Sequence, residues 1–404
     1  MRHFFSAVIL LLPLLLELSA VSFAETPEKC VDIAHGHNPV IAGDGEEHIH
    51  VVFESSAKDH KVQHIFHTQS ADGGRIWTAP QDISSSQGAS WEPDIATEAS
   101  GAIDVCWVDT ASGEAHPDVF FARSADRGKS WSAPVNVSKT PGVSSEPAIA
   151  VGPDKAVHVV WTDTTNGVTD IFYSRSSDNG KSWSPFMDIA KTPGKSHEPA
   201  TVVSASGTVH VAWVDTSFGE SHPDIFYSRY LEGRWTKPYN VSKSAHVSQH
   251  PTLACSHDDK IYLAWADSSR KLHAPDIWGV VSGERGYFAK PLNFSDTPGV
   301  SSQPQIASDG KARLALVWSD TSLGGMEIFG RIGIKGGFSS VLNFSHTKEK
   351  SHSPDVALIG NLVYVAWEAD AANEHIIKIT SCSADVPTGP VFAVDPEIHA
   401  HNSR

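Results

Sequence analysis

Short hydrophobic runs separated by polar turn residues recur along almost the whole chain. The runs are four to seven residues long, are rich in Val, Ile, Phe, Tyr and Trp, and are bounded by Gly, Pro, Ser and Asp. Alternation of apolar and polar positions over such lengths is typical of half-buried β-strands, and no stretch beyond the N-terminus shows a sustained helical period. The pattern therefore predicts an all-β protein.

The runs belong to a longer unit that occurs seven times. A proline marks the same place in each unit, at steps of 50 to 54 residues, and follows the polar residues Asn38, Glu92, Glu146, Glu198, His250, Gln303 and Ser353. Each unit carries four runs, of which the second ends in Phe53, Trp107, Trp161, Trp213, Trp265, Trp318 or Trp367. Four antiparallel strands in each of seven units predict a seven-bladed β-propeller formed by residues 25–404 as one domain, with these aromatic side chains in its core.

Three units share the motif S-x-D-x-G-x-x-W between the third and fourth runs. Its residues are Ser70, Asp72, Gly74 and Trp77, then Ser124, Asp126, Gly128 and Trp131, then Ser176, Asp178, Gly180 and Trp183. Asp and Ser can bond the backbone of a turn, Gly can adopt a positive φ, and Trp can pack back onto the blade. The motif resembles the Asp-box, or BNR repeat, of the sialidase-like superfamily. That resemblance implies a structural box on the face away from the active site.

Charge and the N-terminus restrict where the protein works and what it binds. Residues 1–24 combine Arg2, an apolar run from Phe4 to Leu16 and a Ser22-Phe23-Ala24 end, which is typical of a secretory signal. We therefore expect a secreted, periplasmic or cell-surface protein without a membrane span after cleavage. The net charge of −16 is spread along the chain and disfavours nucleic acid and anionic membranes as partners. We expect a monomer.

The cysteine positions suggest how the ring closes. Cys30 begins a run that resembles a fourth strand, and Cys382 ends the third run of unit seven. An N-terminal strand beside that third run would be antiparallel to it, which predicts a Cys30–Cys382 disulfide. Residues 391–395 also resemble a fourth strand of unit seven, so the sequence leaves open whether 30–34 or 391–395 fills the outer position.

Strand order predicts two distinct faces. The loops before each first strand and between the second and third strands share one face, here called the top face, whereas the Asp-boxes lie on the bottom face. The polar residues before the prolines should surround the top mouth of the central channel. Among them, Glu92, Glu146, Glu198 and His250 are candidate ligands for a divalent cation such as Ca²⁺ or Mn²⁺ if they converge. The alternative is a hydrated polar rim.

Paired acids in five units, such as Asp163 with Asp170, are interpreted as caps of loop backbone because their repetition indicates a structural role. Departures from the repeat are more informative about function. Those of the top face that suit a sugar, with aromatic rings for stacking and polar groups for hydroxyls, are Trp91, His197, Phe218, His222, Arg270, His273 and His352. Further departures are His60 and His64 in unit one and Glu368, Asp370 and His375 in unit seven.

The resemblance raises the question of sialidase chemistry. Sialidases of that superfamily hold the substrate carboxylate with three arginines, and an anionic sugar does require fixed cations. The strand order places only Arg270 on the top face, and no Arg-Ile-Pro motif occurs. The first hypothesis is therefore a non-catalytic propeller that binds a glycan or another extracellular ligand on the top face. The alternatives are a glycoside hydrolase or lyase that uses top-face carboxylates or histidines, and a metal-dependent site at the channel mouth.

Overall fold

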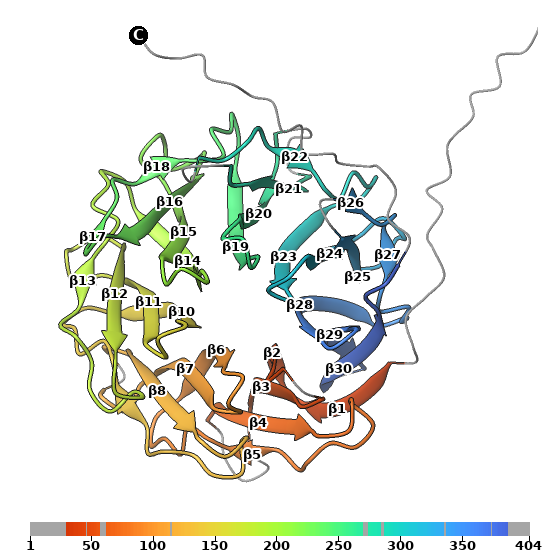
Figure 1. Cartoon of the computed structure of the whole chain (residues 1–404), viewed down its shortest axis with the longest axis horizontal. Helices are drawn as coiled ribbons and strands as arrows, with labels where there is room; N and C mark the ends of the chain where they lie inside the picture. Colours follow the sequence, from red (N-terminus) through yellow and green to blue (C-terminus); the bar gives the residue numbers. More distant parts are fainter. Residues whose placement is uncertain are drawn as a thin grey trace, which may run out of the picture.

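The computed structural model describes residues 30–45, 47–56, 62–113, 115–269, 274–283, 287–334, 337–372 and 374–386. These residues form seven antiparallel sheets arranged around a central channel (Figure 1). No helix occurs among them, and thus no helical segment that could cross a membrane. The prediction of an all-β, seven-bladed propeller is confirmed. The predicted signal, residues 1–24, lies outside the described residues.

The innermost strand of every blade lines the channel (Figure 1). These first strands are β2 (His37–Gly43), β6 (Ser90–Thr97), β10 (Ser144–Val151), β14 (Ser196–Val203), β19 (Ser248–Cys255), β23 (Ser301–Ser308) and β28 (Lys350–Ile359). The second strands are β3 (Ile49–Ser55), β7 (Ile103–Asp109), β11 (Val157–Asp163), β15 (Val209–Asp215), β20 (Ile261–Asp267), β24 (Arg313–Asp320) and β29 (Leu362–Ala371).

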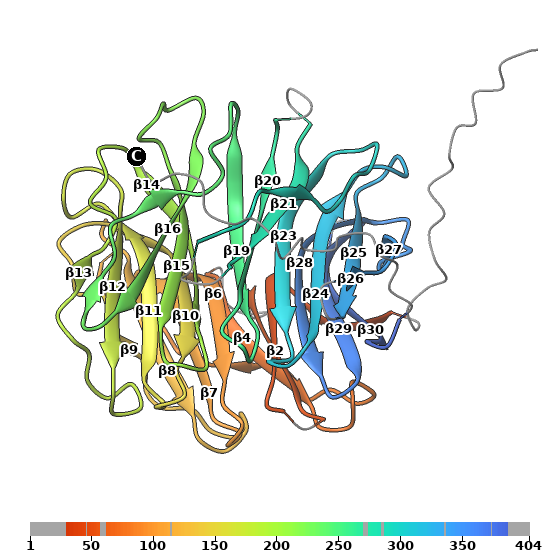
Figure 2. The same ribbon diagram turned by 45° about the horizontal axis from the view of Figure 1, so that its top comes forward.

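The third strands continue each blade outward. They are β4 (His64–Ser70), β8 (Asp118–Ser124), β12 (Asp170–Ser176), β16 (Asp224–Leu231), β21 (Asp276–Val281), β25 (Glu327–Ile334) and β30 (Glu374–Ser383). The strands of neighbouring blades stand side by side around the channel (Figure 2). The register shows that the Asp-box turns and the turns between first and second strands share one face, as predicted.

The fourth strands are shorter than the apolar runs that predict them. Each has two residues, in β5 (Gln81–Asp82), β9 (Val135–Asn136), β13 (Met187–Asp188), β18 (Tyr239–Asn240), β22 (Leu292–Asn293) and β27 (Leu342–Asn343). Side-chain bonds replace further ladder pairs; for example, Asn136 Nδ2 and Ser138 Oγ donate to Asp118. Two units without an Asp-box have an additional short strand in place of the box turn. These strands, β17 (Arg234–Trp235) and β26 (Gly337–Phe338), pair with the far end of the extended third strand.

The last blade is completed by the N-terminal strand β1 (Val31–His35), which pairs antiparallel with β30. The predicted clasp is thus confirmed, and residues 30–34 rather than 391–395 begin the outer strand; residues 391–395 lie outside the described part. The predicted disulfide is not formed. Val31 lies opposite Ile379, so that Cys30 continues the register to Thr380 rather than to Cys382. Diagonal neighbours are about 7–8 Å apart at Cα, more than the roughly 4.4–6.8 Å that a disulfide spans.

The side chains of the Asp-boxes bond the backbone of their own turns. In the second box, Ser124 Oγ donates to Asp126 Oδ1 at 2.8 Å, and Asp126 accepts the backbone N–H of Ser130 at 2.9 Å. The hydroxyl and the backbone N–H of Ser130 lower the pKa of Asp126 to about 2. Gly128 has a φ of 74°, and a Cβ there would lie 2.3 Å from the ring of His67 in the preceding blade. The box therefore seals the groove between two blades on the bottom face.

The repeated aromatic residues fill the core, as predicted. Phe53 and the six tryptophans that end the other second strands are all less than 2% exposed. In five blades the indole N–H is satisfied by an aspartate two residues later, as in Trp161, which donates to Asp163 Oδ2 at 2.9 Å. The same carboxylate accepts the hydroxyls of Thr140 and Ser144. The interpretation of the repeated acids as structural is confirmed for these second-strand aspartates.

Candidate functional site: the top face and the closing seam

The seven residues before the prolines form a belt around the channel mouth. All seven have a left-handed φ between 46° and 54°, namely Asn38, Glu92, Glu146, Glu198, His250, Gln303 and Ser353. This conformation interrupts the ladder to the second strand and turns the backbone N–H toward the preceding blade. Glu146 N donates to Glu92 Oε2 and Glu198 N to Glu146 Oε2, both at 2.7 Å. At these two junctions, a glutamate carboxylate of one blade thus accepts a hydrogen bond from the belt N–H of the next blade.

In the first and last blades, the carboxylate that accepts the belt N–H of the next blade comes from the second strand. Asn38 and Ser353 are too short to reach the next blade as a glutamate does, and the residue after the aromatic of the second strand takes over. Glu54 Oε1 accepts Glu92 N at 2.8 Å, and Glu368 Oε2 accepts Asn38 N at 3.2 Å. The first and last blades are the only two with glutamate at this position. Glu368 keeps its second oxygen, Oε1, available for other partners.

The belt encloses a hollow of about 470 Å³ at the mouth of the channel. Its wall includes the four residues predicted as metal ligands, Glu92, Glu146, Glu198 and His250. Burial, together with the charges of Glu146 and Glu54, raises the pKa of Glu92 to about 7 although the N–H of Glu146 opposes the shift. The first-strand residue Asp355 reaches the same hollow.

The structure brings the four predicted metal ligands to one rim, but it uses the three glutamates for hydrogen bonds between blades. One oxygen of each of Glu92, Glu146 and Glu198 accepts the N–H of the following belt residue. They are not among the groups of at least three potential ligands whose donor atoms lie within 4.8 Å of one another in the described residues. Both groups that meet this condition contain Glu368 instead.

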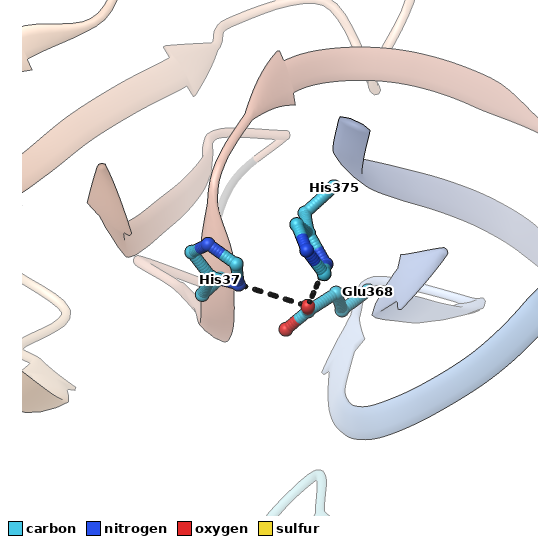
Figure 3. Close-up of side chains that lie close together, drawn as sticks. All are labelled: His37, Glu368 and His375. Carbon is cyan, nitrogen blue, oxygen red and sulfur yellow. Dashed lines mark hydrogen bonds and ion pairs between the residues drawn. The ribbon is translucent and has the colours of Figure 1, made fainter. Parts of the chain in front are cut away.

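A cluster of three histidines and two carboxylates lies where the last blade meets the first. We call His37, His352, Glu368, Asp370 and His375 the seam cluster. Glu368 Oε1 is 2.9 Å from His37 Nδ1 and 2.7 Å from His375 Nδ1, and both rings point at this oxygen (Figure 3). Asp370 Oδ1 is 3.1 Å from His375 Nδ1 and 3.2 Å from His352 Nε2. The Glu368 side chain is 4% exposed, whereas that of His375 is 45% exposed.

Strand geometry explains the convergence within the last blade. Glu368 and Asp370 are two residues apart on β29 and therefore share a face of the sheet. His352 on β28 lies opposite Glu368, and His375 on β30 lies opposite Asp370. Only two residues, 372 and 373, separate β29 from β30, so that both strands continue to the top face and keep these pairs in register.

His37 comes from the first blade and depends on the clasp. Between β1 and β2 lies Gly36, whose N–H donates to the carbonyl oxygen of His375 at 3.0 Å. A Cβ at Gly36 would lie 2.5 Å from the carbonyl oxygen of Glu54 and 2.6 Å from the ring of Phe53. Glycine is therefore required for the close approach that places His37 against Glu368.

The sequence-predicted ligand residues do not form one site. Trp91 and His352 stand at equivalent positions, immediately before the belt, in blades that flank the first blade. His197 and the exposed Phe218 and His222 belong to the fourth blade, well around the ring from the seam (Figure 1). Arg270 and His273 lie outside the described residues. Of this predicted set, His352 alone belongs to the seam cluster.

In the sequence, Glu368, Asp370 and His375 are departures from the repeat that do not stand out as candidate site residues. One pattern does distinguish Glu368. The position after the second-strand aromatic is Val, Thr, Val, Ala and Ser in the second to sixth units and Glu in the first and last. The short spacing between the second and third runs of unit seven was a further signal. Neither signal reveals that His37, 331 residues before Glu368, is their partner.

A pH effect on stability is expected from the channel wall. Burial raises the pKa of Asp355 to about 7, although its carboxylate accepts the N–H of Ile41 at 2.7 Å. An acid whose pKa is raised on folding favours the folded state fully below its unfolded pKa of about 4, and this contribution is lost as the pH rises through 7. The Asp355→Asn variant cannot titrate there. Its stability relative to the wild type should therefore increase by about 2–4 kcal/mol between pH 4 and pH 8.

Urea unfolding of both proteins across this pH range measures the difference directly. Taking the difference cancels the titration of groups that the variant leaves alone, such as the buried His67, whose pKa burial lowers to about 3. A stability difference that stays constant with pH would contradict a raised pKa at Asp355.

Comparisons with known proteins agree with this architecture. The family model described as BNR repeat-like domain matches residues 20–187, which confirms the resemblance drawn from the Asp-boxes for that part of the chain. No curated protein matches the sequence. Several hundred solved chains match the structure. At identities below 25%, such matches show the fold alone.

Three of these structures illustrate the kinds of protein that share the fold. Penicillium chrysogenum α-L-arabinanase, complexed with arabinobiose, is 13% identical with a TM-score of 0.54, over 73% of this chain and 93% of its own. An ulvan lyase is 14% identical with a TM-score of 0.55, over 77% and 81%. The Trypanosoma rangeli sialidase is 13% identical with a TM-score of 0.52, over 86% of this chain and 55% of its own. The chain is thus similar in fold to propellers that include glycoside hydrolases and a polysaccharide lyase.

Proposed function

We propose that this protein binds a carbohydrate polymer on its top face, along the arc formed by the last, first and second blades. The observation that carries the proposal is the concentration of His352, His37 and Trp91, three equivalent positions in consecutive blades, beside the hollow of about 470 Å³. An indole ring offers a stacking surface for the apolar face of a sugar, and imidazoles and carboxylates bond its hydroxyls. Solved propellers of this fold include one complexed with arabinobiose.

The arginines of the described residues support a ligand other than a sialic acid. Arg123 bonds Asp104 and Glu98, Arg127 bonds Asp44, and Arg175 bonds Asp154, all toward the bottom face. No arginine clamp occurs on the top face among the residues that the structure describes. The proposed ligand is therefore a neutral glycan, or one whose charge is met by histidine.

Titration calorimetry with a panel of plant, algal and bacterial polysaccharides tests the proposal. Trp91→Ala should weaken binding of the best ligand about tenfold, because one stacked ring contributes on the order of 1–1.5 kcal/mol. Ile76→Ala is the matched control, since Ile76 is 73% exposed in an Asp-box turn on the bottom face. Absence of binding to the whole panel, or equal losses in the two variants, would count against the top-face arc.

Catalysis is the second candidate, and the seam cluster is the observation that favours it. A buried carboxylate 2.7 Å from a half-exposed imidazole can hold and transfer a proton, as required in a glycoside hydrolase or a lyase. Analysis of the same polysaccharides for new reducing ends or unsaturated products separates the two candidates. Turnover that disappears in His375→Ala indicates an enzyme, whereas binding without turnover indicates a lectin-like propeller.

We also propose that the protein is exported and monomeric, because residues 1–24 have the composition of a secretory signal and the net charge is −16. The N-terminal sequence and native mass of protein recovered from outside the producing cell test both points. Retention of residues 1–24 there would exclude cleavage, and a dimeric mass would exclude the monomer.

A further inference from the structure

We propose that the seam cluster binds one divalent transition-metal ion, with His37, Glu368 and His375 as ligands and His352 and Asp370 completing the site. This inference goes beyond glycan binding and does not depend on it. It differs from the predicted site at Glu92, Glu146, Glu198 and His250, whose carboxylates are engaged in the belt.

The donor atoms have the spacing of a coordination shell. The ligand atoms of His37, Glu368 and His375 all lie within 4.8 Å of one another, and so do those of His352, Glu368 and Asp370. The separations between a histidine nitrogen and a carboxylate oxygen run from 2.7 Å between His375 Nδ1 and Glu368 Oε1 to 3.8 Å between His352 Nε2 and Glu368 Oε1. Metal–ligand bonds of about 2.0–2.2 Å place neighbouring donors roughly 3–3.6 Å apart, so that small side-chain movements would admit an ion.

The buried charge of Glu368 also favours a bound cation. Glu368 is 4% exposed, and its ion-pair partners in the described part of the chain are the three histidines. The rings of His37 and His375 have centroids only 4.2 Å apart, and both present Nδ1 to the same oxygen, Glu368 Oε1. A buried carboxylate is stabilised by a cation close to it. One divalent ion among these donor atoms would supply that positive charge.

The surrounding groups already orient the ligands. Asn38 N–H holds Glu368 Oε2 at 3.2 Å, which leaves Oε1 directed at the rings. His352 Nδ1 lies 3.3 Å from Ser353 Oγ, and a bond there leaves the Nε2 lone pair facing the cluster. The backbone bond from Gly36 to His375 fixes the two blades at this point. Outer contacts of this kind are typical of metal centres, where they fix ring orientation and tautomer.

The donor set indicates the class of ion. Imidazole nitrogens with carboxylate oxygens suit Zn²⁺, Mn²⁺, Fe²⁺ or Co²⁺, whereas Ca²⁺ and Mg²⁺ prefer oxygen alone. The side chains of His37 and His375 are 37% and 45% exposed, so one side of the cluster faces solvent. A bound ion would therefore retain a position for water or for a ligand oxygen, next to the channel mouth.

Metal analysis of the full chain, without any glycan, tests the inference. The purified protein should contain about one transition-metal ion per chain, or take up one Zn²⁺ in calorimetry after treatment with a chelator. Co²⁺ in its place should give the visible absorption of a nitrogen–oxygen site. His375→Ala and Glu368→Gln should each weaken Zn²⁺ binding by more than about tenfold.

Two controls keep the test decisive. His116→Ala removes an exposed top-face histidine of the second blade, outside the seam cluster, and should bind Zn²⁺ like the wild type. Glu368→Gln affects the belt as well, so the thermal unfolding of each variant is measured; His375→Ala should unfold like the apo wild type. The inference is overturned if chelator-treated protein takes up no ion stoichiometrically, or if His116→Ala loses as much affinity as His375→Ala. Glycan binding can fail while metal binding succeeds, and the reverse, so the two proposals are judged separately.

Discussion

Deleting residues 30–35 is expected to destabilise the propeller by about 4–6 kcal/mol and to make it self-associate. The deletion removes β1, which forms four register pairs with β30 and places Ile33 and Ala34 against the core of the last blade. It also removes the ion pair between Asp32 and Lys378 at 2.7 Å. Ladder bonds contribute about 1 kcal/mol each, and burial of an isoleucine about 1.5–3 kcal/mol. The uncovered edge of β30 would become available to another chain.

Thermal unfolding and size-exclusion chromatography of the deletion variant measure these two effects. Val31→Thr is the matched control because Val31 is 42% exposed in the same strand and should change stability little. Because β1 leads directly to His37, the deletion should also abolish metal binding at the seam. A deletion variant that stays monomeric and unfolds at the wild-type temperature would show that β1 does not close the ring.

Replacing Asp163 by alanine is expected to cost about 3–5 kcal/mol, the largest effect of a single substitution that the blades predict. Asp163 is fully buried. Its Oδ2 accepts Thr140 Oγ1, Ser144 Oγ and Trp161 Nε1 at 2.7–2.9 Å, and its Oδ1 accepts Thr165 N at 2.8 Å. Alanine would leave the buried donors of Ser144 and Trp161 without this acceptor and open a cavity beside the indole.

Asp154 in the same blade is an exposed aspartate whose replacement should cost little stability. Its side chain is 57% exposed and pairs with Arg175 at 2.7 Å, so Asp154→Ala should cost less than about 1 kcal/mol. Urea unfolding of the two variants measures the difference. Equal stability of Asp163→Ala and Asp154→Ala would mean that the repeated aspartates are not the structural centres that their bonds indicate.

The last blade shows how repetition and function divide the sequence. Where five blades carry the structural aspartate, the last has Ala369, and Trp367 Nε1 has no hydrogen-bond partner in the described part of the chain. The same strand carries Glu368 and Asp370 toward the seam. The predicted rule, that a departure from the repeat marks a candidate site, leads to the strand that carries Glu368 and Asp370 of the seam cluster. It does not by itself single out that cluster, because Trp91, Phe218 and His222 depart from the repeat as well.

Several predictions could be made from the sequence because they depend on local or periodic information. The recurrence of four apolar runs predicts the blades, and the box residues predict their turn because its hydrogen bonds span only a few positions. The predicted disulfide is wrong for a related reason. The antiparallel direction of β1 beside β30 follows from strand order, but the register, which decides whether two thiols meet, does not, and it places Val31 opposite Ile379.

The belt residues show which structural features could not be predicted from the sequence. Their equivalent positions place Glu92, Glu146 and Glu198 on one rim, and the sequence predicts this correctly. Whether carboxylates on a rim converge on an ion or bond the next blade depends on backbone direction. The left-handed φ of Asn38, Glu92, Glu146, Glu198 and His250 turns the N–H of each toward a glutamate carboxylate of the preceding blade, and no periodicity in the sequence encodes that direction.

The amino-acid sequence by itself determined the propeller, its seven blades and its two faces, because strand periods and turn chemistry act over short distances. The choice between the two candidate outer segments of the last blade was open in the sequence, and the pairing of β1 with β30 decides it. Tertiary structure alone decided that His37 meets Glu368 and His375 across the closing seam. Ring closure brings together residues that are more than 300 positions apart, and their contact depends on the angle between two blades and on the absence of a side chain at Gly36. Such a contact has no local signature, and for that reason the site had to be found in three dimensions.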